Sequence, residues 1–248
     1  ATKLEEWLYR SSYMVTGQTQ GIVKDIKSRF PNKTVNWLPN GVDKSIFATK
    51  FNPGKRKEMG FSENDFLLLY AGIIGIAQGL DVILDAAKLI PANSNVKFLL
   101  LGDGPEKERL ITRVNTENIT RVYFLDLVGR SEVPSIVSSV DAAVIPLKKM
   151  ELFLGAIPSK IFENLALEKP LLLAVDGEAR ELFINQGKCG LFTEPENAEE
   201  LAEAAVYMEQ HPDECKAMGT NGKAYAQKYF MRENIAKDWI AAMHAMQK

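Results

Sequence analysis

Two features of the sequence predict an α/β fold with a parallel sheet that is covered by helices on both faces. Short apolar runs alternate with longer amphipathic stretches from about residue 66 onward. The runs lack internal polar alternation, so both faces of the corresponding strands are expected to be buried. Strands that alternate with helices in this way form right-handed βαβ units. The sequence therefore predicts a Rossmann-like domain over residues 48–230.

The elements of this domain follow in a regular order. The apolar runs predict strands at residues 66–71, 96–101, 122–125, 142–146, 170–175 and 190–192. The amphipathic stretches predict helices at 80–90, 106–118, from about 133, at 158–167 and at 178–186, and the Glu- and Ala-rich residues 197–246 are also expected to be helical. Pro105 suits the first turn of its helix.

Such sheets bind ligands beyond the carboxyl ends of their strands. The strand-to-helix loops that meet there are expected to form a single binding mouth. They comprise residues 72–79, 102–105, 126–130, 146–160 and 175–178.

Residues 1–47 do not fit this domain. Leu4, Trp7 and Leu8 form one helical face, followed by a strand at 13–16, a helix at 22–30 and a strand at 35–39. A β-α-β unit of this size does not bury both faces of its own strands. We therefore expect residues 1–47, which do not open with Met, to be the remnant of a preceding domain plus a connecting segment. Residues 231–248 are expected to form a C-terminal helix that packs back toward that domain.

Composition and charge narrow the class of protein. The chain is 46% hydrophobic and 25% charged with a net charge of −2, which is typical of a soluble globular protein. Residues 1–60 hold eleven Lys and Arg against five Asp and Glu, a balance of +6, so the remainder carries −8. This acidic majority argues against a nucleic-acid-binding protein. The basic end is either a solvated face or a peripheral contact with anionic lipid headgroups.

No secretory leader and no apolar run long enough to span a bilayer is visible, so a cytoplasmic location is expected, with peripheral association at the inner face of the cytoplasmic membrane as the alternative. Cys189 and Cys215 lack metal-ligand spacing and are expected to be free thiols. His211 and His244 stand alone on predicted surface helices. No metal site is expected.

A glycine-rich loop follows the first strand of the predicted domain. Its glycines, Gly72, Gly75 and Gly79, have the spacing G-x-x-G-x-x-x-G, which matches neither the dinucleotide fingerprint nor the phosphate loop of nucleotide hydrolases. Glycines at this position allow backbone amides to approach a phosphate. The same pattern also suits a tight turn that packs a helix onto its strand.

The start of the helix at 158–167 carries a second candidate site. Ser159 is a plausible N-cap, and Lys160 at a helix start is unfavourable for the helix dipole unless an anion also binds there. Lys160 and the surrounding amides therefore predict a diphosphate cradle, and Glu163 is placed to accept hydrogen bonds from a ribose diol. The alternative is a solvated lysine and a glutamate that stabilises the helix dipole.

Four segments of the chain, which include the glycine loop and Glu163, resemble motifs of the GT-B glycosyltransferases of family 4. They are residues 38–43 with Phe47, residues 70–86 around the glycine loop, the Gly-Asp-Gly-Pro turn at 102–105, and residues 163–170. In order and at the family's spacing, the matches extend over about residues 38–205. The Pro-Ser-Lys variant at 158–160 is similar to that of bacterial capsule, O-antigen and colanic-acid transferases.

The resemblance implies that the chain is the C-terminal, donor-binding half of a GT-B enzyme. Such an enzyme would transfer a sugar, with retention, from a nucleotide diphosphate (UDP is the expected nucleotide) to a glycan or lipid-linked acceptor in surface polysaccharide synthesis. No cofactor is implied besides the nucleotide-sugar, and the catalytic groups are expected in the missing half. The implied donor-binding residues are Gly72, Ile73, Gly75, Gln78, Gly79, Gly102, Asp103, Leu127, Val128, Ser159, Lys160, Ile161 and Glu163, with the backbone of Leu127 and Val128 meeting the base.

The chain departs from the family pattern at three positions. Gln78 stands where the family usually has Lys, and Ile73 lies near a position where the family often has Arg. Gly155 stands where the family has a Glu eight positions before the ribose-binding Glu, here Glu163. Our hypothesis is that Lys160 replaces the missing phosphate-binding cation. A nucleotide-sugar epimerase and a non-catalytic nucleotide-binding module remain as alternatives, although an epimerase needs His at the cleft and both histidines are badly placed for that. The fragment is expected to bind the nucleotide-sugar donor without transferring the sugar.

Overall fold

The computed structural model describes residues 2–246, and its larger sheet has six parallel strands. They are β3 (Phe66–Ala71), β4 (Val96–Leu101), β5 (Val122–Leu125), β6 (Ala142–Pro146), β7 (Leu171–Ala174) and β8 (Gly190–Phe192). The strand order is β5-β4-β3-β6-β7-β8 and every neighbouring pair is parallel. The chain therefore winds outward from β3 in one direction and from β6 in the other. The α/β class predicted from the sequence is confirmed.

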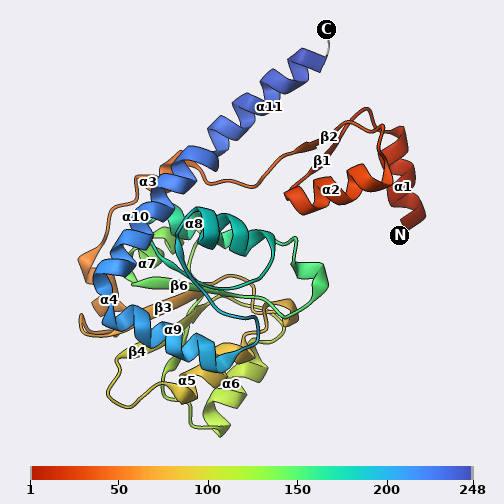
Figure 1. Cartoon of the computed structure of the whole chain (residues 1–248). Helices are drawn as coiled ribbons and strands as arrows, with labels where there is room; N and C mark the ends of the chain where they lie inside the picture. Colours follow the sequence, from red (N-terminus) through yellow and green to blue (C-terminus); the bar gives the residue numbers. More distant parts are fainter. Residues whose placement is uncertain (1, 247–248) are drawn as a thin grey trace.

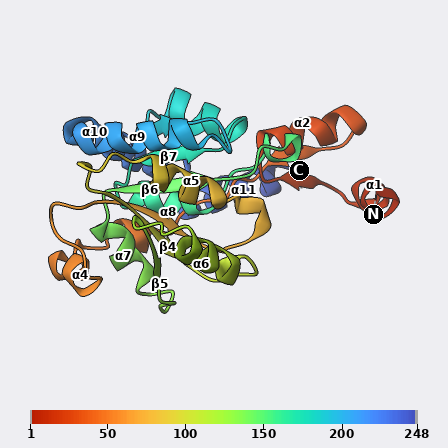
Figure 2. The same ribbon diagram turned by 90° about the horizontal axis from the view of Figure 1, so that it is seen from below.

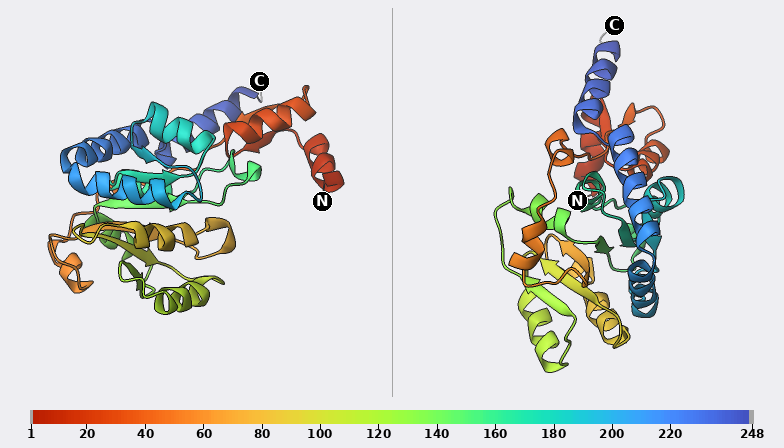
Figure 3. Two further views of the ribbon diagram at one scale, coloured as in Figure 1. Left: turned by 60° about the horizontal axis from the view of Figure 1, so that its bottom comes forward. Right: turned by 90° about the vertical axis from the view of Figure 1, so that its left-hand side faces the viewer.

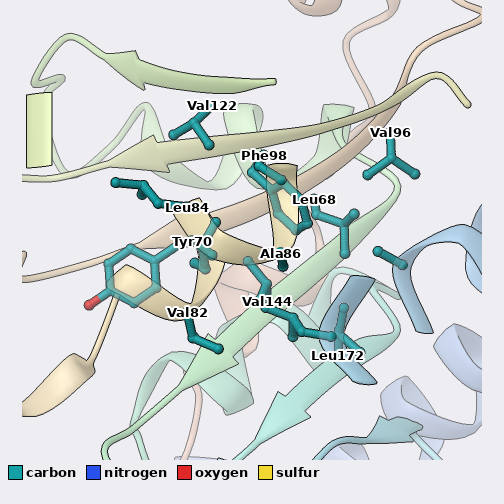
Figure 4. Close-up of a cluster of buried hydrophobic side chains, with 14 of the residues drawn as sticks. Leu68, Tyr70, Val82, Leu84, Ala86, Val96, Phe98, Val122, Val144 and Leu172 are labelled. Carbon is teal, nitrogen blue, oxygen red and sulfur yellow. The ribbon is translucent and has the colours of Figure 1, made fainter. Parts of the chain in front are cut away.

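One face of this sheet is covered by α5 (Asp81–Leu89), α6 (Lys107–Thr116) and α9 (Ala198–Gln210). Leu68, Tyr70, Phe98 and Leu100 are among the strand side chains that pack against these helices, and all four are fully buried. Figure 4 shows Leu68, Tyr70 and Phe98 in this cluster.

The other face carries Leu67, Leu69, Ala143 and Ile145, which belong to two further buried clusters. Those clusters include residues of α7 (Val133–Ser139), α8 (Lys160–Ala166) and α10 (Pro212–Tyr229). Helices therefore lie above and below the strands, as the layers in Figures 2 and 3 show. Burial of both faces explains why the strands lack polar alternation.

Helix boundaries agree with the predictions with a few exceptions. The helix expected at 158–167 begins only at Lys160, after a 3₁₀ turn at Glu151–Phe153, and the one expected at 178–186 is wound as a π-helix over Arg180–Gln186. A 3₁₀ turn at Ile76–Gln78 precedes α5. Two short helices, α3 (Lys44–Phe47) and α4 (Pro53–Glu58), were not predicted.

The amino-terminal residues form a separate small unit. It contains α1 (Thr2–Ser11), β1 (Val15–Gly17), α2 (Gln20–Arg29) and β2 (Val35–Trp37), and its two strands pair in parallel. Figure 1 shows this unit beside the six-stranded sheet rather than in it. Leu4, Trp7 and Leu8 of α1 are exposed.

The connection between the two units is tied to the turn between α10 and α11 (Arg232–Met246). The Val42 amide donates to the Phe230 carbonyl, and the Arg232 amide donates to the Val42 carbonyl. The Arg232 guanidinium also donates to both carboxylate oxygens of Asp43 at 2.7 Å. From this anchor, α11 runs away from the six-stranded sheet (Figure 1).

Ala1 of the amino-terminal segment and the last two residues of the helix expected over 231–248 lie outside the described residues. Within residues 2–246, none of the helices combines the length and the apolar character needed to cross a membrane.

Candidate functional site

A cleft of about 1340 Å³ lies at the carboxyl ends of the central strands. The loops after β3, β4, β5 and β6 contribute to its wall, so four of the five predicted strand-to-helix loops meet there. Ten of the predicted site residues line it: Gly72, Ile73, Gln78, Gly102, Asp103, Leu127, Val128, Ser159, Lys160 and Glu163. Gln18, Thr19 and Ile22 of the amino-terminal unit also line the cleft.

Three predicted residues lie elsewhere. Gly75 and Gly79 line a separate hollow of about 250 Å³ with Arg109 and Lys148, and Ile161 is completely buried in the core. Gly79 has a φ of +58°, and a Cβ there would lie 3.1 Å from Cγ of Lys148. Glycine at this position is thus explained by a left-handed turn and by close packing of the chain.

The loops after β3 and β4 are locked together by their backbones. The Gly72 amide donates to the Leu101 carbonyl at 2.9 Å, and the Ile74 amide donates to the Asp103 carbonyl at 2.8 Å. A Cβ on Gly102, whose φ is +154°, would lie only 1.8 Å from the carbonyl oxygen of Gly72. Only glycine allows this approach, so this side of the cleft has a fixed backbone.

The ammonium group of Lys160 lies over the ring of Tyr70, with Nζ 3.6 Å from the ring centroid. No carboxylate within the described part of the chain pairs with it. Burial lowers the pKa of Lys160 to about 7, because removal from water disfavours the charged form. The cleft therefore holds a lysine that lacks a counter-ion among residues 2–246.

The first turn of α8 differs from the predicted cap. Ser159 is at the N-cap position, but its backbone is already helical and its side chain accepts no capping hydrogen bond, so this prediction was wrong. Glu163 is exposed, and its carboxylate has no hydrogen-bond or ion-pair partner among residues 2–246. The Asn164 side chain, by contrast, is buried and donates to the Lys160 carbonyl at 2.8 Å.

The fifth predicted loop, residues 175–178, does not line the cleft and holds the amino-terminal unit instead. The carboxylate of Glu178 accepts hydrogen bonds from the backbone amides of Gln20 and Gly21 at 2.6 and 2.7 Å. These are the first two residues of α2, where backbone amides lack helical partners and the helix dipole favours an anion. Glu178 thus caps a helix that comes from the far end of the chain.

Sequence reasoning missed several residues that line the cleft or shape it. Tyr70 was interpreted only as part of the apolar strand at 66–71, and nothing in the neighbouring sequence indicates its contact with Lys160. Arg130, which lines the cleft and has no ion-pair partner among residues 2–246, and the Asp43–Arg232 pair were also missed. Arg130 stands in the loop 126–130, which was expected to face a ligand, and its charge was the available signal.

The clustered metal ligands, reactive thiols and cleft histidines on which some enzymes rely are not found among residues 2–246. No group of three or more His, Cys, Asp or Glu side chains within residues 2–246 is arranged to hold a metal ion. Both cysteines are free and buried, and burial raises the pKa of Cys215 to about 11. No histidine lines the cleft in this part of the chain.

A parallel sheet with a cleft at the carboxyl ends of its strands defines an α/β protein of the Rossmann-like, ligand-binding class. Residues 52–225 match the family described as glycosyl transferases group 1, and the chain belongs to this family.

Among curated proteins, the chain is 27% identical to an uncharacterized glycosyltransferase of Methanocaldococcus jannaschii, over 78% of this chain and 53% of that protein. It is 23% identical to the putative colanic acid biosynthesis glycosyl transferase WcaI of Escherichia coli K12, over 75% of this chain and 44% of that protein. The chain spans about half the length of the curated relatives it matches.

Solved structures agree on the fold. A crystal structure of Anabaena HepE in complex with UDP and glucose matches 98% of this chain and 66% of that chain, with a TM-score of 0.82 at 20% identity. Sucrose-phosphate synthase of Thermosynechococcus elongatus matches 98% of this chain and 61% of that chain, with a TM-score of 0.83 at 18% identity. The chain has the GT-B type of α/β fold.

Proposed function

We propose that the cleft binds the nucleoside diphosphate of a nucleotide-sugar, and that the chain is the donor-binding part of a glycosyltransferase. The observation that carries the proposal is the pair of side chains on α8. Lys160 and Glu163 both line the cleft, and each lacks an ionic partner among the described residues. Residues three apart lie on the same side of a helix, so a cation and a hydrogen-bond acceptor are offered together.

The proposed donor fits the cleft with its diphosphate near Lys160 and the locked loops at Gly72 and Gly102. The ribose diol donates to Glu163, and the base meets the backbone at Leu127 and Val128. Developing negative charge on the departing diphosphate is stabilised best by groups that are already oriented, which the locked loops supply. UDP is the proposed nucleotide, and retention at the anomeric carbon is the proposed outcome.

Residues 48–230 are the proposed donor domain, and residues 1–47 the proposed part of an acceptor domain. Gln18, Thr19 and Ile22 line the cleft from that side, where a glycan or lipid-linked acceptor would approach. Surface polysaccharide synthesis is the proposed setting, with peripheral membrane contact through the amino-terminal unit. Since the chain spans about half of its curated relatives, we propose that it binds donor without transferring sugar. Measurable transfer by this chain alone would contradict that part of the proposal.

Nucleotide binding is tested first by thermal shift with UDP, GDP and ADP, followed by calorimetry with the nucleotide that stabilises the chain. Loss of hydrogen bonds to a charged acceptor costs about 1.5–3 kcal/mol, so Glu163→Ala is expected to weaken UDP binding by at least about tenfold. Glu203→Ala, an exposed glutamate on α9, is the matched control and leaves affinity unchanged. The proposal is wrong if none of the three nucleotides raises the melting temperature.

A further inference from the structure

The ring of Tyr70, which Nζ of Lys160 contacts, is held in one orientation. Tyr70 is fully buried within the cluster formed by β3, β4 and α5, and its hydroxyl donates to the Ile73 carbonyl. Figure 4 shows the ring at the border of this cluster, with the hydroxyl oxygen directed away from the other labelled side chains. Core packing on one side and a hydrogen bond on the other fix the orientation of the ring.

Lys160 is held close to this ring and to the glycine loop. Its Nζ lies 3.6 Å from the ring centroid, well inside the about 6 Å at which a cation is attracted by a ring face. A Cβ on Gly72 would lie 3.0 Å from Nζ of Lys160, so glycine at position 72 makes room for the ammonium group. Because the site is partly withdrawn from water, this attraction is stronger than at an exposed surface.

The other charged groups that face the cleft leave Lys160 unpaired. They are Asp43 before α3, Asp103 after β4, Arg130 after β5, Glu163 on α8 and Arg232 on α11. Asp43 is engaged by Arg232. None of the five forms a hydrogen bond or ion pair with Lys160 among the described residues, so the ring of Tyr70 is its one charge-stabilising contact there.

We propose that Tyr70 is a positioning residue for Lys160: its ring holds Nζ over the glycine loop without a counter-ion among the described residues, so that an incoming diphosphate is the first anion to pair with it. This inference rests on the proposed function of the cleft. Where the amine of Lys160 is neutral before binding, it takes up its proton from solvent, and no covalent bond is made or broken in the nucleotide.

The direction of proton movement follows from the burial of Lys160. In the free protein, burial holds the pKa of Lys160 at about 7, and a bound diphosphate raises that pKa because it favours the ammonium form. At pH 8 the free lysine is mainly neutral and becomes charged on binding, so uptake of close to one proton is expected. At pH 6 the lysine already carries its proton, and uptake falls toward zero.

The first experiment measures this uptake by calorimetry of UDP at pH 6 and 8, in pairs of buffers with different ionisation enthalpies. The terminal phosphate of UDP titrates near pH 6, so its own contribution is subtracted with the Lys160→Met variant. Wild type is expected to take up close to one proton more than K160M at pH 8. Equal proton uptake by the two proteins at pH 8 overturns the inference for Lys160, even where UDP binds.

The second experiment isolates the ring without removing its volume. Tyr70 is replaced by phenylalanine and by phenylalanines that carry one and three fluorines, which weaken the attraction of the ring for a cation. Tyr70→Phe is the reference of the series, because it already lacks the hydroxyl that donates to the Ile73 carbonyl. Relative to this variant, UDP affinity at pH 8 is expected to fall about three- to tenfold as fluorines are added. The same series in the K160M background is expected to be flat. Trifluorophenylalanine at Phe98, which is buried in the same cluster, is the control for core damage.

A ligand-free measurement separates this inference from the proposed function. Competitive acetylation between pH 5 and 10, read by mass spectrometry, gives the pKa of Lys160, which is expected to fall stepwise as fluorines are added at position 70. Failure of wild type to bind UDP contradicts the proposed function, whereas an unchanged Lys160 pKa across the series contradicts the role of Tyr70. A pKa that falls while UDP affinity stays constant also overturns the role, because the ring would then not prepare the lysine for its ligand.

Discussion

Replacement of Gly102 by alanine is expected to disrupt the contact between the two loops that form one side of the cleft. The added Cβ would lie 1.8 Å from the Gly72 carbonyl oxygen and 2.9 Å from its carbon. Real Cβ atoms do not approach backbone oxygen so closely, so the loops after β3 and β4 must separate. The backbone at Gly102 also has a φ of +154°, which alanine adopts only with strain.

The magnitude follows from what the separation breaks. The hydrogen bonds from Gly72 to Leu101 and from Ile74 to Asp103 join the two loops, and each contributes about 1 kcal/mol. Strain at a residue with unfavourable φ adds about 1–3 kcal/mol. Gly102→Ala is therefore expected to lower the free energy of unfolding by about 3–5 kcal/mol.

Urea unfolding followed by circular dichroism measures this loss, as a lower midpoint with an unchanged slope. Gly129→Ala is the matched control, since a Cβ there meets nothing closer than 3.7 Å. The control is expected to stay within about 0.5 kcal/mol of wild type. If Gly102→Ala proves as stable as Gly129→Ala, the two loops are not locked in the way that the geometry indicates.

Three further changes are expected to have measurable effects. Asp141→Ala leaves the buried guanidinium of Arg56 without its carboxylate and should cost about 3–5 kcal/mol in urea unfolding; a loss below about 1 kcal/mol would show that the pair is not structural. Glu178→Gln removes the charge that caps α2, so hydrogen exchange at the amides of Gln20 and Gly21 should quicken, and unchanged exchange would contradict the cap. Because burial lowers the pKa of Lys160 to about 7, the unfolded chain binds more protons between pH 7 and 10, and wild type should gain stability relative to Lys160→Met as pH rises through that window. A constant difference between the two proteins would refute the lowered pKa.

The strands were predictable because their burial has a local signature. The run at 66–71 is apolar throughout, and the structure places Leu67, Leu68, Leu69 and Tyr70 against helices on two faces. A short, continuously apolar run between helical patterns is typical of a parallel strand that is buried on both faces. The position of the cleft then followed from the carboxyl ends of those strands.

The glycines show where local reasoning stops. Gly72, Gly75 and Gly79 share one loop, but only Gly72 faces the cleft, whereas Gly79 accommodates Lys148. Spacing in sequence does not distinguish a glycine that admits a ligand from one that admits another part of the chain. The same limit applies to Ser159, whose residue type suits a cap that the local backbone does not form.

Contacts between distant segments had no sequence signal. Lys160 was singled out from its place at a helix start, but the ring beneath it belongs to β3. Glu178 was predicted to lie in a ligand-facing loop, but its carboxylate caps α2 of the amino-terminal unit. In both cases the partner is chosen by tertiary packing, which residue type and periodicity do not encode.

A crystal structure of the chain soaked or grown with UDP tests the central claim most directly. The account predicts the diphosphate beside Lys160 and the loops at Gly72 and Gly102, with the ribose hydroxyls within hydrogen-bond distance of Glu163. A diphosphate bound elsewhere, or a ribose that leaves Glu163 without contact, would contradict the assignment of this cleft as a nucleotide-sugar site.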